Sequence, residues 1–330
     1  MIPFGLALLL APGCRDPDPR PDDPDSGPPP DSGPPPDSGT PPDTGDVPPV
    51  VRCADLLPVP LSAQALDTPR ASYDVAFDAE GALLGAHDGG LWRYPSSGAG
   101  TPVTVGIGPL YQFEWLQSGE LAVMVANSAW LERLDVATGG HVPMGPGGYA
   151  VRLGPDDRVW TANGQTLSRL TLETGTQEVV VAALPDGSPK VIEFDRDGTT
   201  AYLGTTGGTG LVYTLALDAA GEPTGEPTVF AGPVGAGWHD AIGLDACGNL
   251  YLTDAMTSAL YRIDDTGTVE LVLDLAPEDH AHGLRWGSGV GGWREDALYL
   301  SQPYGGDHVA RVIVGVPHRG WNGGRYTVVR

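Results

Sequence analysis

The sequence is poor in basic residues and contains a single lysine, Lys190. Eighteen Lys and Arg stand against 42 Asp and Glu, which gives the 330 residues a formal net charge of −24. A field of this sign repels nucleic acid and anionic lipid headgroups. We therefore expect no nucleic-acid partner and no attachment to a membrane through charge.

The chain begins without a long hydrophobic stretch. The apolar run over residues 1–13 is too short to cross ~30 Å of hydrocarbon as a helix. We interpret residues 1–14 as a signal peptide. Ala11 and Gly13 before Cys14 resemble the lipobox of bacterial lipoproteins, which implies lipidation of Cys14. The expectation is an exported protein of the bacterial cell envelope, anchored to a membrane by lipid only, with ordinary secretion as the alternative.

Residues 15–52 contain almost nothing apolar to bury. Asp-Ser-Gly-Pro-Pro-Pro occurs twice, at 25–30 and 31–36, and the segment holds nine Asp, three Arg and no Glu. Such a composition cannot form a packed core and is typical of an extended, self-repelling tether. We predict a disordered, acidic, Pro-rich linker over 15–52 and a folded domain over 53–330.

Cysteine is scarce, with three residues in the chain. If Cys14 carries lipid, Cys53 and Cys247 remain as a possible pair. An exported chain meets oxidising conditions, which permit a disulfide. We predict a bond between Cys53 and Cys247; two unpaired thiols are the alternative.

Aromatic residues make up only 7% of the chain, whereas Gly and Pro number 48 and 33. This balance fits a turn-rich all-β protein. Residues 240–254 show the repeated unit: an alternating strand, a four-residue turn at 245–248, and a second strand. Five other segments copy it at intervals of about forty residues, and third and fourth strands follow in most copies. The sequence therefore predicts a six-bladed β-propeller of about four antiparallel strands per blade.

A propeller must close its ring, because an open array leaves exposed sheet edges. Either residues 59–66 or residues 326–329 could complete the sixth blade. We favour the N-terminal segment, because the sixth unit is otherwise long and Gly-rich. We also expect a monomer.

One position recurs at the beginning of the first strand of every unit. In a propeller these strands line the axis, so the six side chains should meet at one mouth of the central channel. They are Tyr73, Tyr111, Tyr149, Lys190, Asp240 and His282. We predict Tyr73, Tyr111, Tyr149 and Lys190 as ligand-binding residues.

The unit at 240–254 resembles the repeat of the gluconolactonase and regucalcin-like family of six-bladed propellers, and the similarity extends over about residues 71–315. The resemblance implies hydrolysis of sugar lactones or related esters with one divalent cation, calcium or zinc. The family's metal-site aspartate falls on Asp240, but its other ligand positions fall on Tyr73, Tyr149 and Lys190. Phenols and an ammonium are poor partners for a hard cation.

Two hypotheses follow. The first is a propeller that binds a small polar or carbohydrate-like ligand at the mouth, without a cofactor and without metal-dependent turnover. The second is a divergent lactonase or esterase with Asp240 as base or metal ligand and His239 or His282 as proton carrier. A register slip of one residue would place Asp74 beside Asp240 in its metal site. A purely structural module with a plugged channel is a third possibility, and no Gly-x-Ser-x-Gly nucleophile motif is present.

Overall fold

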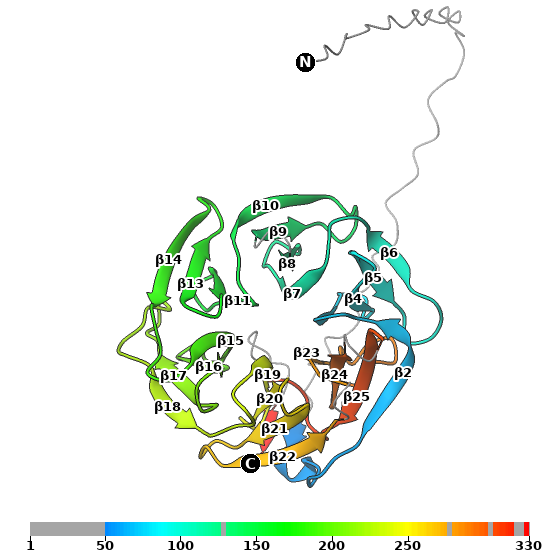
Figure 1. Ribbon diagram of the computed structural model, residues 1–330. Helices are drawn as coiled ribbons and strands as arrows, with labels where there is room; N and C mark the ends of the chain where they lie inside the picture. The colour runs from blue at the N-terminus through cyan, green and yellow to red at the C-terminus, as the bar shows by residue number, and fades with distance from the viewer. Residues whose placement is uncertain (1–49, 127–129, 276–278, 303–305, 320–326, 330) are drawn as a thin grey trace, which may run out of the picture. The chain divides into compact units, whose positions relative to one another are not determined.

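The computed structural model describes residues 50–126, 130–275, 279–302, 306–319 and 327–329. Six four-stranded antiparallel sheets surround a common axis within these residues, as Figure 1 shows. This confirms the predicted six-bladed β-propeller. The predicted signal peptide, Cys14 and nearly all of the predicted linker lie outside the described residues.

Each blade runs from an inner strand at the axis to an outer strand at the rim. Blades 1 to 3 consist of β3 (Val75–Phe77), β4 (Leu83–His87), β5 (Gly90–Tyr94) and β6 (Thr101–Thr104); β7 (Leu110–Trp115), β8 (Leu121–Val125), β9 (Trp130–Leu134) and β10 (His141–Pro146); and β11 (Ala150–Leu153), β12 (Val159–Ala162), β13 (Leu167–Thr171) and β14 (Thr176–Val181). Blades 4 to 6 consist of β15 (Ser188–Phe194), β16 (Thr200–Thr206), β17 (Val212–Ala216) and β18 (Thr228–Ala231); β19 (His239–Leu244), β20 (Leu250–Asp254), β21 (Ala259–Ile263) and β22 (Val269–Asp274); and β23 (Gly283–Trp286), β24 (Ala297–Gln302), β25 (His308–Ile313) and β2 (Ala63–Arg70).

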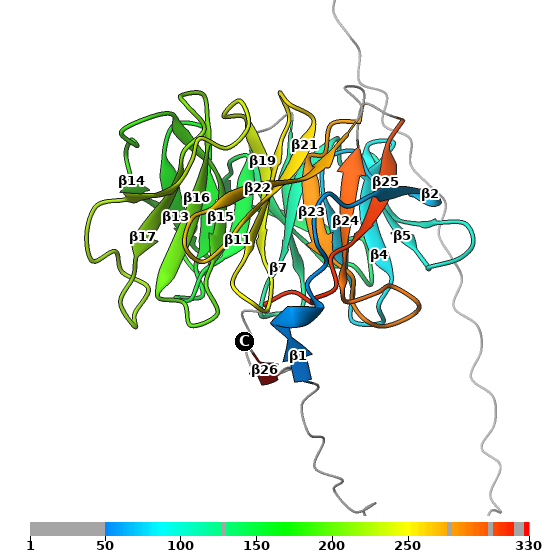
Figure 2. The same ribbon diagram turned by 90° about the horizontal axis from the view of Figure 1, so that it is seen from below.

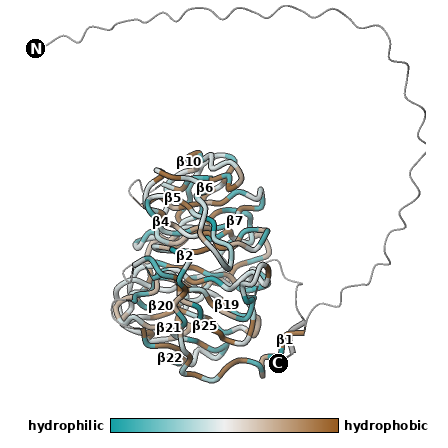
Figure 3. The backbone as a smooth tube through the Cα atoms, turned by 90° about the vertical axis from the view of Figure 1, so that its right-hand side faces the viewer, coloured by the Kyte–Doolittle hydropathy of each residue, from teal (hydrophilic) through white to brown (hydrophobic). Residues whose placement is uncertain are grey.

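Burial falls from the axis to the rim. Every residue of β19 and β20 is buried, whereas half of the outer strand β22 is exposed. Figure 3 shows hydrophobic and hydrophilic residues interspersed along the backbone. The described residues contain no helix long and apolar enough to pass through a bilayer.

Apolar side chains fill the interfaces between neighbouring blades. The described part of the chain holds six buried clusters, one for each interface around the ring. Trp160 of blade 3 meets Phe194 of blade 4 with ring centroids 5.4 Å apart, and Tyr251 of blade 5 meets Trp286 of blade 6 at 5.5 Å. Face-to-face packing of twisted sheets therefore holds the ring together.

The N-terminal segment closes the ring. Strand β2 pairs antiparallel with β25 and completes blade 6, which confirms closure from the N-terminal side at residues 63–70 instead of 59–66. The competing C-terminal residues form β26 (Thr327–Val329), which pairs in parallel with β1 (Val50–Arg52) in a separate two-stranded sheet. Figure 2 shows this small sheet beyond one face of the ring.

Strand β1 lies at the predicted boundary between the linker and the folded domain. It lies inside the range predicted as linker, 15–52, but its backbone pairs with β26 and it leads directly into the short helix η1 (Cys53–Asp55).

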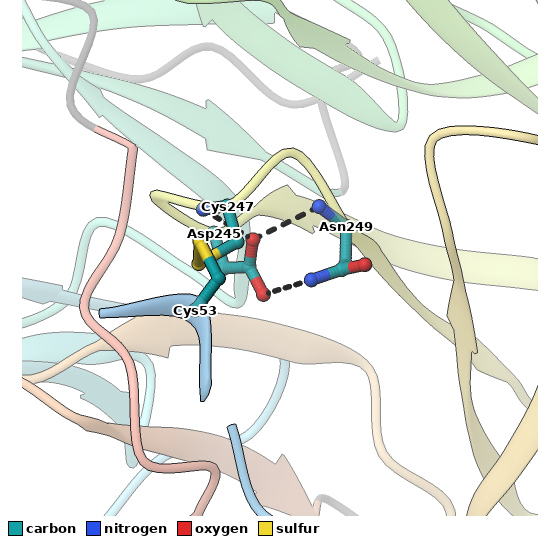
Figure 4. The surroundings of a disulfide bond; sticks show 4 residues. All are labelled: Cys53, Asp245, Cys247 and Asn249. Atoms are coloured by element: carbon teal, nitrogen blue, oxygen red, sulfur yellow. Dashed lines mark hydrogen bonds between the residues drawn. A yellow bond between two sulfur atoms is a disulfide. The ribbon is translucent and has the colours of Figure 1, made fainter. Parts of the chain in front are cut away.

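A disulfide joins Cys53 of η1 to Cys247, across 194 residues of sequence and with Cα atoms 5.6 Å apart (Figure 4). Cys247 lies in the turn between β19 and β20. Asp245 holds this turn, since its Oδ1 accepts the backbone N–H groups of Cys247 and Asn249 at 2.8 and 2.9 Å. Because Cys247 follows the last residue of the inner strand β19, the disulfide holds the beginning of the domain near the C-terminal end of that strand. The first residues of the inner strands lie at the other end.

Candidate functional site

The six recurring residues form a closed circle of contacts around the axis, which we call the axial cluster. Ring centroids of Tyr73 and Tyr111 lie 4.6 Å apart, and those of Tyr111 and Tyr149 lie 6.4 Å apart. The Lys190 ammonium lies 5.7 Å from the Tyr149 ring centroid and forms an ion pair with Asp240. His282 completes the circle: its Nδ1 is 2.9 Å from Asp240 Oδ2, and its ring centroid is 5.3 Å from that of Tyr73.

Irregular pairing at the strand beginnings accompanies three of these positions. Lys190 and Asp240 each lie at a register shift, between Pro189 and Val191 in β15 and between His239 and Ala241 in β19. A similar shift in β7 covers Tyr111. An extra residue in one strand bends it and redirects its side chains, and such bulges are frequent beside functional sites.

Asp240 is the charged centre of the axial cluster. It is only 4% exposed, with Lys190 on one carboxylate oxygen and His282 on the other. Burial opposes its ionised form, but the contacts with His282 and Lys190 more than offset burial and hold the pKa of Asp240 below its usual range. The carboxylate is therefore ionised at neutral pH and already paired.

Trp238 belongs to the same site, although its position was not among the predicted residues. The Lys190 ammonium lies 4.8 Å from the Trp238 ring centroid, a distance suited to a cation–π contact. Trp238 and Tyr149 are 44% and 48% exposed, so two aromatic rings flank Lys190 and still face solvent. The spacing in the sequence indicates this position: Trp238 lies two residues before Asp240, as Asp240 lies two residues before Ile242, and residues two apart in a strand share a face.

Gln112 spans the axis next to the axial cluster. Its Nε2 donates to the backbone carbonyl of Asp240, in the opposite blade, at 3.3 Å, while its Oε1 accepts the N–H of Val151 at 3.2 Å. The side chain is 8% exposed. Gln112 thus links blades 2, 3 and 5 through its two hydrogen bonds.

Further along the axis lies a charged layer. Its members are Asp74, Glu114, Arg152, Glu193 and Arg285. Arg152 lies 3.3 Å from Glu114 and 3.5 Å from Glu193. Arg285 lies 3.2 Å from Asp74 and also donates to the carbonyl of Phe113 at 2.6 Å. These ion pairs cross-link the inner strands.

Asp74 belongs to this charged layer and not to the ion pair of Asp240. Its Oδ2 accepts the N–H of Phe113 at 3.1 Å and faces Arg285, and its Oδ1 accepts the N–H of Val75 at 2.9 Å. Burial raises the pKa of Asp74 although Arg285 and Arg152 act in the opposite direction. The register slip that would pair Asp74 with Asp240 is not what the structure shows.

The donor set of the axial cluster does not suit a divalent cation. Both oxygens of Asp240 face cationic or proton-donating groups, and Lys190 adds positive charge where a metal needs negative charge. No group of three or more His, Cys, Asp and Glu in the described ranges could hold a metal ion.

His239 lies apart from the axial cluster, which speaks against its predicted role as proton carrier. It is fully buried between blades 4 and 5, where its Nδ1 accepts the N–H of Thr205 at 2.8 Å. Its Nε2 lies 3.1 Å from the carbonyl of Val234, so this nitrogen carries the proton. Burial lowers the pKa of His239, and the imidazole is a neutral structural group.

Comparison with known proteins gives likeness in fold without detectable likeness in sequence. No family model matches the chain, and no curated protein matches it significantly. Among solved structures, a gluconolactonase from Xanthomonas campestris superposes with a TM-score of 0.64 at 13% identity, over 82% of this chain and 95% of the other. The calcium-binding protein regucalcin from Agrobacterium tumefaciens gives 0.60 at 18% identity, over 79% and 96%. An auxiliary nutrient binding protein from Bacteroides thetaiotaomicron gives 0.59 at 11%, over 73% and 68%.

The chain is therefore a six-bladed β-propeller of the kind found in gluconolactonase and regucalcin, which confirms the resemblance at the level of fold.

Proposed function

We propose that the protein binds a small polar or carbohydrate-like ligand at the axial cluster and does so without metal-dependent turnover. Three tyrosines and Trp238 offer apolar ring faces beside Lys190 and His282. This mixture of flat apolar surface and a few polar groups suits a ligand of the same mixed character. The likeness to a nutrient binding protein is consistent with such a role.

One observation carries the proposal: the Lys190 ammonium is already paired with the buried Asp240 carboxylate. A buried carboxylate needs a partner, and here a side chain supplies it. A divalent cation at the same place would have to displace Lys190. The residues therefore favour binding through rings and hydrogen bonds over metal-assisted chemistry.

The test is calorimetric titration of the purified full chain with neutral monosaccharides, their methyl glycosides and the corresponding lactones. We expect at least one neutral sugar to bind with equal affinity in excess calcium and in chelator. Tyr149→Ala should weaken that binding, while Val229→Ala, at an exposed site on the outer strand β18, should not. Binding or turnover that requires calcium would contradict the proposal.

A second candidate is hydrolysis of a lactone or ester, and the contact between Asp240 and His282 favours it. With Nδ1 directed at the carboxylate at 2.9 Å, the imidazole has the orientation of a general base held by an acid. The gluconolactonase likeness points to the same substrates. Metal-independent hydrolysis across a lactone and ester panel, abolished by His282→Gln, would establish this candidate and remove simple binding.

Export and lipid anchoring remain part of the proposal, with Cys14 as the acylated residue. Expression in a bacterial host with labelled palmitate should label the full chain and place it in the membrane fraction. Cys14→Ser should abolish the label, and label retained on this variant would overturn the assignment. Light scattering of the variant in solution should give the mass of a monomer.

A further inference from the structure

Trp238 combines an exposed side chain with a firmly held main chain. The indole is 44% exposed, but the backbone carbonyl accepts the N–H of Ala255 at 2.9 Å, and Trp238 forms a β-bridge with Thr206. The backbone N–H of Trp238 donates to Asp254 Oδ2 at 2.8 Å. An exposed aromatic ring on a fixed loop is the arrangement expected of a preformed contact surface.

Asp254, the last residue of β20, holds this loop through its side chain. The carboxylate is 1% exposed, and its Oδ2 also accepts the N–H of Ala236 at 3.2 Å. Its Oδ1 accepts the N–H and the hydroxyl of Thr257 at 2.8 and 2.9 Å. The loop wraps so closely that a Cβ on Gly235 would lie 2.6 Å from the Asp254 carboxyl carbon. Two of the four hydrogen bonds to this buried carboxylate come from Ala236 and Trp238 and fix the loop 235–238, while the two from Thr257 hold the carboxylate in place.

We propose that Trp238 is the stacking surface for a saturated cyclic ligand with an apolar C–H face, such as a pyranose, and that Asp254 is the residue that positions it. The proposal rests on ligand binding at the axial cluster. Lys190 lies over one face of the indole, 4.8 Å from the ring centroid, and the other ring face takes the C–H side of the ligand. Asp254 does not touch the ligand and acts through the backbone of Trp238.

The first test needs no ligand and uses the fact that Lys190 is the chain's single lysine. Biosynthetic labelling with ¹³C-lysine gives NMR signals from one residue. In the wild type, the Lys190 Hε protons should be shifted upfield by the ring current of Trp238, and Trp238→Ala should remove that part of the shift. Asp254→Asn, which replaces an accepting oxygen by an NH₂ group, should move the signal toward that of Trp238→Ala.

The matched control is Asp264→Asn. Asp264 also accepts loop N–H groups, from Thr266 and Thr268, but it follows the end of β21 that is remote from Asp254. This variant should leave the Lys190 signal unchanged. An Asp254→Asn signal identical to wild type, or a wild-type signal equal to that of Trp238→Ala, would overturn the positioning role.

The second test is titration with the sugar that the wild type binds. Trp238→Ala should weaken affinity about tenfold, Trp238→Phe should retain most of it, and Asp254→Asn should fall between them. If Asp254→Asn does not fold, the comparison of Trp238→Phe with Trp238→Leu still tests stacking. If the wild type binds the sugar and Trp238→Ala binds it equally well, this inference alone is overturned. If the wild type binds no sugar, the proposed function is overturned.

Discussion

Lys190 and Asp240 form an ion pair between neighbouring blades, and each lies at a register shift at the beginning of its inner strand. Their side chains are 10% and 2% exposed. Because a bulge redirects side chains, this local irregularity is what turns both residues toward the axis. The pair therefore serves two purposes, since it joins blades 4 and 5 and neutralises the centre of the axial cluster.

Removal of the Lys190 charge should be costly. Lys190→Met leaves Asp240 buried with His282 as its remaining partner, and we expect a loss of about 3 kcal/mol in the free energy of unfolding, measured by chemical denaturation. The double variant Lys190→Met with Asp240→Asn should recover most of the loss, because no buried charge is then left unpaired.

The exposed pair of Arg294 and Asp296 provides the control, since its side chains are 49% and 28% exposed. Arg294→Met should cost less than about 1 kcal/mol. Equal losses from Lys190→Met and Arg294→Met would mean that burial does not govern the ion pair at the axis.

His239 should make stability depend on pH. Burial holds its folded-state pKa below the usual 6.5, so the unfolded chain takes up a proton below pH 6.5 while the folded chain does not. Stability is then fully present above pH 6.5 and decreases as the pH falls, by up to about 1.4 kcal/mol per pH unit for one proton.

His318 contributes in the same direction, since burial also lowers its pKa. Denaturant titrations between pH 7 and 5 should give a smaller slope of stability against pH for His239→Gln than for wild type, and a further decrease when His318→Gln is added. An unchanged slope in both variants would show that these imidazoles titrate normally in the folded protein.

Much of the fold follows from local pattern, because hairpin turns and alternating strands depend on neighbouring residues. The repeat around Asp245 predicts the blades, and the frame of Tyr73, Tyr111 and Tyr149 predicts that these rings meet. Closure by β2 was also predictable, although its bounds shifted by four residues. A closed ring leaves few alternatives once the blades are counted.

The site itself depends on contacts distant in sequence. Gln112 reaches the backbone of Asp240, 128 residues away, and no spacing along the chain signals this. The burial of His239 follows from the packing of blade 4 against blade 5, so proximity to Asp240 in sequence was misleading. Trp238 was missed because no other blade repeats it.

The disulfide should stabilise the propeller, because it links residues separated by 194 positions. We expect Cys53→Ala with Cys247→Ala to lower the free energy of unfolding by about 2–5 kcal/mol. Reductant should lower wild-type stability to a similar level and leave the double variant unchanged. A wild type equally stable with and without reductant would mean that the bond does not constrain the unfolded chain.

The seam between blades 6 and 1 gives the last prediction. The loop of blade 6 packs on Gly81, whose φ is +84°, and a Cβ there would lie 2.6 Å from Val290 Cβ. Gly89, with φ +68° and nothing within 4 Å of an added Cβ, is the matched control. Each alanine variant should lose about 1 kcal/mol of stability, because a residue with a Cβ disfavours the left-handed backbone. Gly81→Ala must also displace the blade 6 loop. Thermal unfolding should therefore show a clearly larger loss for Gly81→Ala, and equal losses would mean that the loop does not hold the seam.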